Sequence, residues 1–188
     1  MKSQKYIDLS HNTIRDGIIT YKGLPAPIIC DDLSREKSRK HYEEGIEFQI
    51  GKIEMVSNTG TYIDVPFHRY VNGKDLSETS IDKMADLERI IVHIDKNKKE
   101  IDEDVFYDLA MEGKAVLIHT GWDQYWNTDQ YFENHPYLTE KAAQYLMDKR
   151  ASLVGIDSVN IDDTSGKGRP VHTTLLGREI LIVEHLCN

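Results

Sequence analysis

Four short apolar runs in the second half of the chain place the strongest constraint on its fold. All four are strand-like, and they lie at 88–94, 115–119, 153–156 and 180–183. The first two are compact β-branched or apolar runs, as in strands that are buried on both faces of a sheet. Helical patterns separate these late runs, whereas the strand-like segments of the first half cluster together. This order favours an α/β fold with a mixed sheet or a β/α barrel over a purely parallel, doubly wound sheet.

Two helices are predicted between the strand-like runs. Asp102 has the residue type of an N-cap for the first helix. Acidic residues follow it near the positive end of the helix dipole, and Gly113 can end the helix. Thr139 begins the second, and its apolar residues fall on one side. We therefore expect peripheral helices over 102–113 and from 139 onward.

The first half of the chain is less regular. Residues 6–9 are predicted as a first strand, and the Gly- and Pro-containing segment after it as an irregular loop. Charged residues dominate 31–44, which indicates an exposed excursion. Apolar residues alternate through 46–56 with a break at Gly51, which predicts a long strand with a bulge.

Size and charge exclude several classes of protein. A chain of 188 residues, 39% of them hydrophobic, predicts a single domain over 1–188. The net charge of -9 would repel a phosphate backbone or an anionic membrane, so we expect no nucleic-acid or membrane partner. There is neither a membrane-length apolar run nor an apolar export signal at the start, which predicts a cytoplasmic protein. The two cysteines, Cys30 and Cys187, are expected to be reduced thiols.

One stretch, 57–70, concentrates residues that can carry chemistry. If its first part is extended, then Asn58, Tyr62 and Asp64 share one face of the strand. Pro66 then ends the pairing and fixes a turn, which can bring His68 back over the same pocket. Asp64 before a proline can also be only a turn-former that bonds backbone amides.

The residues from 58 to 68 read N-T-G-T-Y-I-D-V-P-F-H. They resemble H-x-G-T-H-x-D-x-P-x-H, the motif of the metal-dependent cyclase and hydrolase family that includes bacterial kynurenine formamidase and isatin hydrolase. The likeness continues through "VLIHTGWDQYW", "LVGIDSVNID" and "VHTTLLGREILIVEHL". The fold that this resemblance implies is the swivelling β/β/α type, one domain with a mixed sheet or barrel and peripheral helices.

The resemblance implies a metal site with a changed set of ligands. Asn58 and Tyr62 replace the two motif histidines, whereas Asp64, His172 and Glu184 match the ligands of the second metal. Three protein ligands with open positions for water suit one catalytic divalent ion. Two carboxylates and one imidazole form a hard set, so Mn²⁺ and Mg²⁺ compete with Zn²⁺. Taken alone, His172 is better interpreted as a residue in the first turn of a short helix and Glu184 as a surface charge at a strand end; the twelve-residue interval between them, which matches the family, favours a role in the site.

The activity implied by the resemblance is hydrolysis of a small amide, formamide, lactam or lactone. His68 matches the proton donor and acceptor of the family, and an imidazole group suits that role near neutral pH. Tyr21, Asn58 and Tyr62 are expected to contact the small-molecule substrate. Relatives assemble as dimers or tetramers, so a homodimer or homotetramer is expected, with 31–44 as a candidate exchange arm.

A second hypothesis belongs to another class of function. Loss of both motif histidines also fits a noncatalytic protein that binds a small ligand in an inherited pocket. The remaining histidines, including His93 and His119, show no metal-ligand spacing along the chain and are expected to be structural or solvated. His119, beside Thr120 and Gly121, can also line the pocket.

Overall fold

The computed structural model describes residues 7–11, 14–18 and 20–188. The chain divides into two compact units, which we describe separately. The sheet unit comprises Met1–His11 with Thr61–Asn188, and the hairpin unit comprises Asn12–Gly60. The single domain expected over 1–188 stays a prediction. Among the described residues, no helix is both long enough and apolar enough to cross a membrane.

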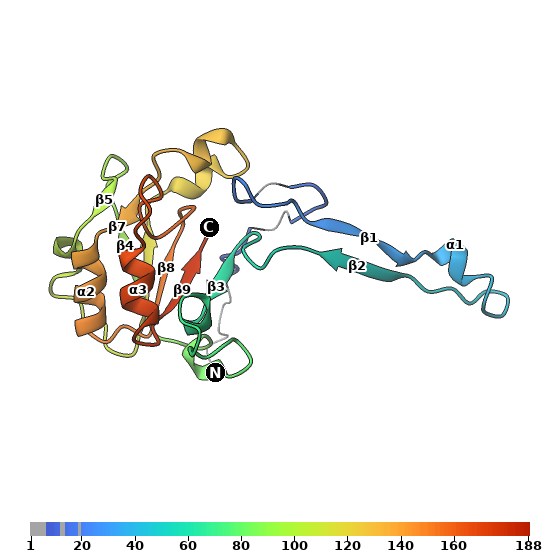
Figure 1. The fold of residues 1–188 in the computed structure, drawn as a ribbon, viewed down its shortest axis with the longest axis horizontal. Coiled ribbons are helices and arrows are strands. Elements are labelled where there is room, and N and C mark those ends of the chain that lie inside the picture. The colour runs from blue at the N-terminus through green and yellow to red at the C-terminus, as the bar shows by residue number, and fades with distance from the viewer. Residues whose placement is uncertain (1–6, 12–13, 19) are drawn as a thin grey trace. The chain divides into compact units, whose positions relative to one another are not determined.

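The sheet unit is built on five strands in the order β3-β9-β8-β6-β4 (Figure 1). Their bounds are β3 Tyr62–Asp64, β4 Arg89–His93, β6 Ala115–His119, β8 Leu153–Ile156 and β9 Leu181–Glu184. Neighbouring strands run parallel except for β3, which pairs antiparallel with β9. The mixed sheet predicted from the sequence is therefore confirmed. A separate parallel pair joins β5 (Glu100–Ile101) to β7 (Tyr137–Leu138).

Helices α2 (Glu140–Asp148) and α3 (Pro170–Leu176) pack side by side on one face of this sheet (Figure 1). The even-numbered residues of the parallel strands point toward them, because side chains alternate across a strand. The core that results includes Val92, Val116, Ile118, Val154, Ile156 and Ile182 from the strands. Odd-numbered residues such as Ile91 and Leu117 point to the opposite face, where both line a cavity.

The two helix predictions have different outcomes. The helix from Thr139 is confirmed: its hydroxyl oxygen accepts a hydrogen bond from the backbone N–H of Ala142. The helix expected over 102–113 is wrong, because only the 3₁₀ turn η3 (Glu103–Phe106) forms. Asp102 accepts from the Thr139 hydroxyl instead of capping its own turn, and helical geometry ends at Tyr107, whose ψ of 145° is extended.

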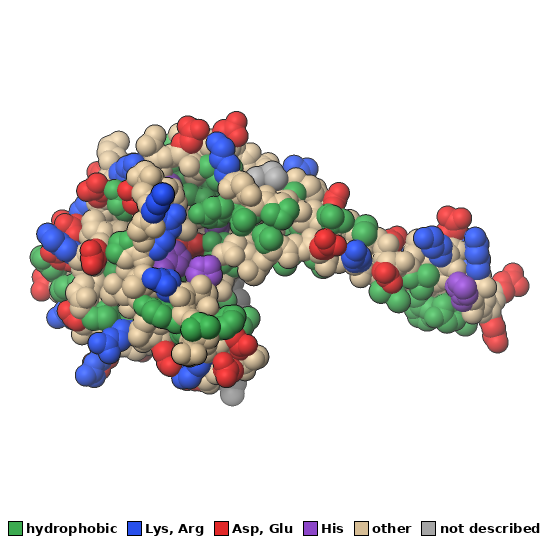
Figure 2. Space-filling model, viewed as in Figure 1, with side chains coloured by type: hydrophobic (Ala, Val, Ile, Leu, Met, Phe, Trp, Pro, Cys, Tyr) green, Lys and Arg blue, Asp and Glu red, His purple; other side chains and the backbone are tan. Residues whose placement is uncertain are grey.

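The hairpin unit is an antiparallel ribbon of β1 (Ile28–Leu33) and β2 (Ile50–Glu54), with the short helix α1 (Arg35–Ser38) between them. Exposed hydrophobic side chains occur along its surface (Figure 2). The long strand expected over 46–56 is shorter than predicted, and the register shift lies in β1, between Asp31 and Leu33, rather than at Gly51. Of the strand expected at 6–9, Tyr6 lies outside the described residues and 7–9 is not a strand.

Four further 3₁₀ turns complete the elements of the sheet unit. They are η1 Pro66–His68, η2 Ile81–Lys83, η4 Trp122–Tyr125 and η5 Asp129–Phe132. Turn η1 follows β3 after a single residue, and turn η4 follows β6. Both turns carry side chains that matter for the sites below.

Candidate metal centre

Strand β3 and turn η1 place the first two candidate residues. Tyr62 and Asp64 lie two apart in β3 and therefore share a face, as the sequence predicts. The strand ends there, and Pro66 begins η1, whose tight turn returns His68 toward the strand. Nδ1 of His68 lies 3.2 Å from Oδ1 of Asp64. Asp64 is buried, whereas the side chain of His68 is 42% exposed.

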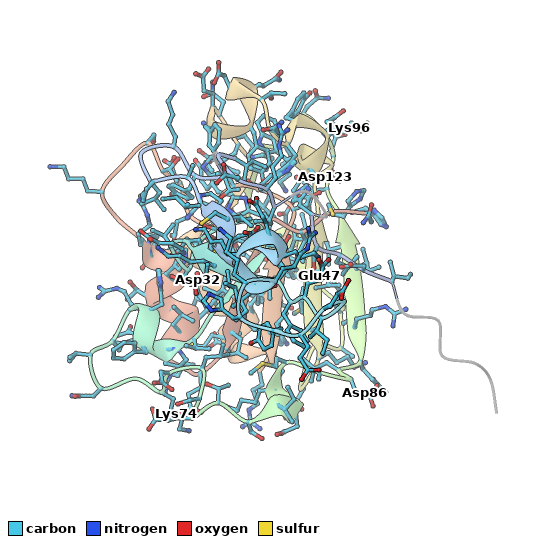
Figure 3. All side chains as sticks on the ribbon, turned by 90° about the vertical axis from the view of Figure 1, so that its right-hand side faces the viewer. Asp32, Glu47, Lys74, Asp86, Lys96 and Asp123 are labelled. Atoms are coloured by element: carbon cyan, nitrogen blue, oxygen red, sulfur yellow. The ribbon has the colours of Figure 1, made fainter. Side chains whose placement is uncertain are left out.

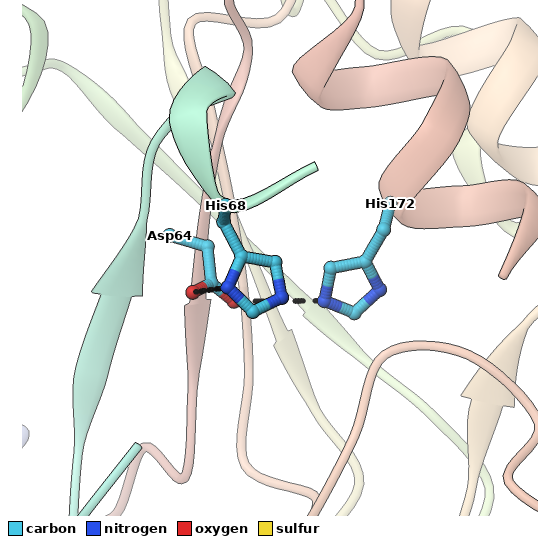
Figure 4. Close-up of side chains that lie close together, drawn as sticks. All are labelled: Asp64, His68 and His172. Carbon is cyan, nitrogen blue, oxygen red and sulfur yellow. Dashed lines mark ion pairs between the residues drawn. The ribbon is translucent and has the colours of Figure 1, made fainter. Parts of the chain in front are cut away.

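Helix α3 places His172 next to the same carboxylate (Figure 4). Its Nε2 lies 3.5 Å from Oδ2 of Asp64, and its ring centroid lies 5.6 Å from that of His68. On its other side, Nδ1 of His172 donates to Oδ2 of Asp162 at 2.5 Å. Asp162 is fully buried and also accepts the backbone N–H groups of Val171 and His172. It therefore fixes both the start of the helix and the orientation of the imidazole.

Strand β9 brings in Glu184, which is fully buried. Its Oε1 lies 3.6 Å from Nε2 of His172 and accepts a 2.7 Å hydrogen bond from the backbone N–H of Ile161. Its Oε2 accepts a hydrogen bond from the hydroxyl of Tyr62, the residue directly opposite it in the ladder. Tyr62 thus contacts a candidate ligand.

The chemistry of these donors fits a metal ion. Donor atoms that share one ion, with bonds of about 2.0–2.2 Å and angles near tetrahedral, lie roughly 3.3–3.6 Å apart. Nε2 of His172 lies 3.5 Å from Asp64 Oδ2 and 3.6 Å from Glu184 Oε1. Oδ2 of Asp64 is buried and has no hydrogen-bond partner among the described residues. An unpartnered buried carboxylate oxygen costs free energy unless a cation offsets its charge.

The pKa values describe the same deficit of positive charge. Burial lowers the pKa of His172, but the hydrogen bond to Asp162 and the nearby carboxylates of Asp64 and Glu184 outweigh it and raise the value to about 10. Burial raises the pKa of Glu184 to about 7, although the charge of His172 opposes this. The cluster therefore favours a positive charge at Nε2 of His172, which either a proton or a metal ion can supply.

The structure does not group the four residues equally. Asp64, His68 and His172 each bring one donor atom within 4.8 Å of the others, and Glu184 is outside that group. His68 is thus a possible metal ligand as well as an acid and base. Tyr21 and Asn58 belong to the hairpin unit. Their contacts with substrate, like the assignment of the metal ligands, stay predictions.

Sequence reasoning missed two residues of this centre. Asp162 stands within "LVGIDSVNID", but nothing in its spacing indicates that it holds His172. Gly73 looks like an ordinary loop glycine. A Cβ added there would lie 2.6 Å from the carbonyl carbon of Pro66, so only glycine lets the loop approach the turn that carries His68.

Gly73→Ala is therefore expected to move η1 and to lower turnover while metal content stays unchanged. Overpacking of this kind costs about 1–3 kcal/mol of stability. Thermal unfolding, metal analysis and kinetics should be compared with Gly166→Ala, because a Cβ at Gly166 meets no atom within 4 Å. Equal behaviour of the two variants would show that the close approach at Gly73 does not matter.

Known proteins resemble the chain over most of its length. A family model described as "Putative cyclase" matches residues 7–163. Kynurenine formamidase from Geobacillus thermodenitrificans (strain NG80-2) is 32% identical over 152 residues, which cover 80% of this chain and 70% of that protein. A solved structure described as a predicted metal-dependent hydrolase from Bacillus stearothermophilus has a TM-score of 0.66 at 27% identity, covering 96% of this chain and 81% of that one.

Isatin hydrolase A from Labrenzia aggregata superposes with a TM-score of 0.74 at 19% identity, covering 97% of this chain and 79% of that one. At this identity the likeness shows a shared fold only. The family resemblance and the cyclase-like α/β fold expected from the sequence are both confirmed.

Proposed function

The chain belongs to the cyclase family, and from that premise we propose that it is a metal-dependent hydrolase of a small amide, formamide, lactam or lactone. The observation that carries this proposal is the buried Oδ2 of Asp64, which has no hydrogen-bond partner within the described part of the chain and lies 3.5 Å from Nε2 of His172. The names of the relatives, a kynurenine formamidase and a metal-dependent hydrolase, support the class of reaction.

In this proposal Asp64, His172 and Glu184 hold one Zn²⁺, Mn²⁺ or Mg²⁺ ion. When bound, such an ion polarises a carbonyl group and lowers the pKa of water. Asp162 keeps the proton on Nδ1 of His172, so that Nε2 presents its lone pair to the ion. Tyr21 and Asn58 are proposed to contact the substrate, and Tyr62 to do so while it donates to Glu184.

His68 has the position needed for proton transfer. Its Nδ1 lies 3.2 Å from the carboxylate of Asp64, which favours a proton on that nitrogen and leaves Nε2 as the acceptor. Its side chain is 42% exposed, so a proton taken from water at Nε2 can reach the leaving nitrogen or exchange with solvent. His68 therefore acts first as base and then as acid.

His68→Ala is expected to abolish turnover while metal content stays unchanged. A positioned acid and base contributes about 10²–10⁴-fold to the rate. The measurement is hydrolysis of N-formylkynurenine, isatin and simple lactones by protein purified without chelators, with metal determined by elemental analysis. His41→Ala, which removes an exposed histidine of the hairpin unit, is the control. If metal is lost along with turnover, His68 is a ligand and its proposed role is wrong.

One observation favours the alternative of a noncatalytic ligand-binding protein. Both carboxylate oxygens of Glu184 already accept hydrogen bonds, from Tyr62 and from the backbone of Ile161, which competes with metal binding. That protein would contain no metal and turn over none of the three substrates, but would still bind one of them in a calorimetric titration. Stoichiometric metal together with turnover would exclude it.

We also propose that the hairpin unit mediates a homodimer or homotetramer. A two-stranded ribbon is marginally stable alone in water. This one exposes Phe48 (52%), Ile50 (53%) and Ile53 (66%), which a second copy of the chain would bury. Such apolar burial gains about 25 cal/mol per Å².

Ile53→Glu is expected to convert the assembly to monomers, because a buried, unpaired charge is costly. The measurement is light scattering coupled to size exclusion. Lys52→Glu, which changes the charge of the neighbouring strand residue, is the control and should stay assembled. A wild-type monomer, or an Ile53→Glu variant that still assembles, would contradict the proposal.

A further inference from the structure

We propose that His93, His119 and Asp123 form a second metal site, which binds one divalent transition-metal ion such as Zn²⁺, Ni²⁺ or Co²⁺. All three residues belong to the sheet unit, but none of them contributes to the centre of Asp64 and His172. The site takes a metal ion as its ligand whether or not the proposed hydrolase activity holds.

Strand pairing brings the two histidines together. His93 ends β4 and His119 ends β6, and the two are partners in the register of this parallel pair. Both have odd numbers and therefore lie on the sheet face opposite the helices. Sequence spacing hides the pair, because the residues are 26 positions apart and meet only through the sheet.

The distance between the two rings suits a shared ion. Nδ1 of His93 lies 2.9 Å from Nδ1 of His119, with the ring planes at 89°. Two imidazole nitrogens that bind one ion at about 2.0–2.1 Å, with an angle of roughly 90–110°, lie about 2.9–3.4 Å apart. Without an ion the two nitrogens can share a single proton, and an ion would replace it.

Asp123 provides the third donor. It lies in η4, just after β6, and brings a carboxylate oxygen within 4.8 Å of a ring nitrogen of His119. His93 is outside that group, so the Asp123 side chain has to turn toward the two rings to bind the same ion. Asp157 has an oxygen in the same group, but its carboxylate already accepts four hydrogen bonds from Thr120 and Gly121. These bonds use the lone pairs of both oxygens. Asp157 is therefore a positioning residue that fixes the turn leading to Asp123.

The local setting allows an ion to enter and favours a transition metal. His93 and His119 are exposed and Asp123 is half-buried, so binding requires no unfolding. Two imidazoles and one carboxylate suit Zn²⁺, Ni²⁺ or Co²⁺ better than Mg²⁺. Asp123 and Lys96 lie at the same end of the unit (Figure 3), and a Cβ built at Gly121 would lie 3.9 Å from Cε of Lys96.

A cavity adjoins the pair of histidines. Both histidines line a cavity of about 750 Å³, whose other walls include Ile91, Leu117 and Leu186. An ion held at its edge would leave coordination positions for water or for a donor group of a small molecule.

The test is calorimetric titration of the metal-free protein with Zn²⁺. Wild type is expected to bind two ions, Asp64→Asn one, and the His93→Ala/His119→Ala double variant one. Asp123→Asn is expected to weaken the second site at least about tenfold without changing the first. His41→Ala serves as the control for loss of an exposed histidine and should match wild type.

The design separates this inference from the proposed function. If the centre of Asp64 binds no ion, wild type still binds one, and the double variant binds none. Circular dichroism checks that the double variant folds, and Asp123→Asn provides an independent answer. The inference is overturned if the double variant keeps the wild-type stoichiometry and affinity, or if Asp123→Asn binds Zn²⁺ as tightly as wild type.

Discussion

Asp64→Asn is expected to lose its bound metal and at least about a thousand-fold in turnover. One carboxylate oxygen pairs with Nδ1 of His68 and the other faces Nε2 of His172. Asparagine has the same shape but is neutral, and one of its terminal atoms becomes an N–H donor, which cannot bind a cation. An ion contributes several kcal/mol to the transition state, and each 1.36 kcal/mol is a factor of ten in rate.

The measurements are metal content by elemental analysis and turnover of the substrates named above. Asp32→Asn, an exposed aspartate of the hairpin unit, is the matched control and should behave as wild type. Because Oδ2 of Asp64 makes no hydrogen bond among the described residues, the variant should fold. Loss of turnover with full metal content would mean that Asp64 serves His68 and not the ion.

Asp162→Asn is expected to weaken metal binding about 10–100-fold and to lower stability by roughly 1–3 kcal/mol. Removing a residue that orients a metal-binding histidine has effects of that size on affinity. The stability loss follows because Asp162 accepts three hydrogen bonds inside the protein, two of them from the backbone of Val171 and His172. Its charge also helps to raise the pKa of His172.

The neighbouring residue offers a close control. Asp163→Asn removes a carboxylate that is partly exposed and accepts hydrogen bonds only locally, from Ser165. Calorimetric titration and thermal unfolding of both variants separate a role in orienting His172 from a general effect of lost charge. Equal metal affinity in the two variants would show that Asp162 does not orient His172 for metal binding.

The strands of the second half could be predicted, because their apolar runs reflect burial on both faces. The run at 115–119 became β6 with unchanged bounds. Local cap signals were less reliable. Asp102 has the residue type of a helix cap, yet its carboxylate accepts from Thr139, 37 positions away, and only a 3₁₀ turn forms. A tertiary contact of that kind leaves no mark in the local sequence.

In the candidate centre too, local features could be predicted and distant contacts could not. The spacing of Asp64, Pro66 and His68 predicts a strand followed by a tight turn, and the side chains of Asp64 and His68 do meet. The approach of His172 and Glu184 was expected only from a family resemblance, because they lie far along the chain. The role of Asp162 and the pairing of His93 with His119 could not be predicted, since each depends on which elements become neighbours in three dimensions.

The antiparallel pairing of β3 with β9 has a consequence for how the protein folds. Asp64 lies opposite Ile182, which is 118 positions later in the chain (182 − 64). Contacts so distant in sequence form slowly, because a long loop must close before they contribute. A chain in which β9 has not yet docked beside β3 therefore carries Asp64 without Glu184 next to it. Binding of the proposed ion would then follow the docking of β9 and would report that this late step of folding is complete.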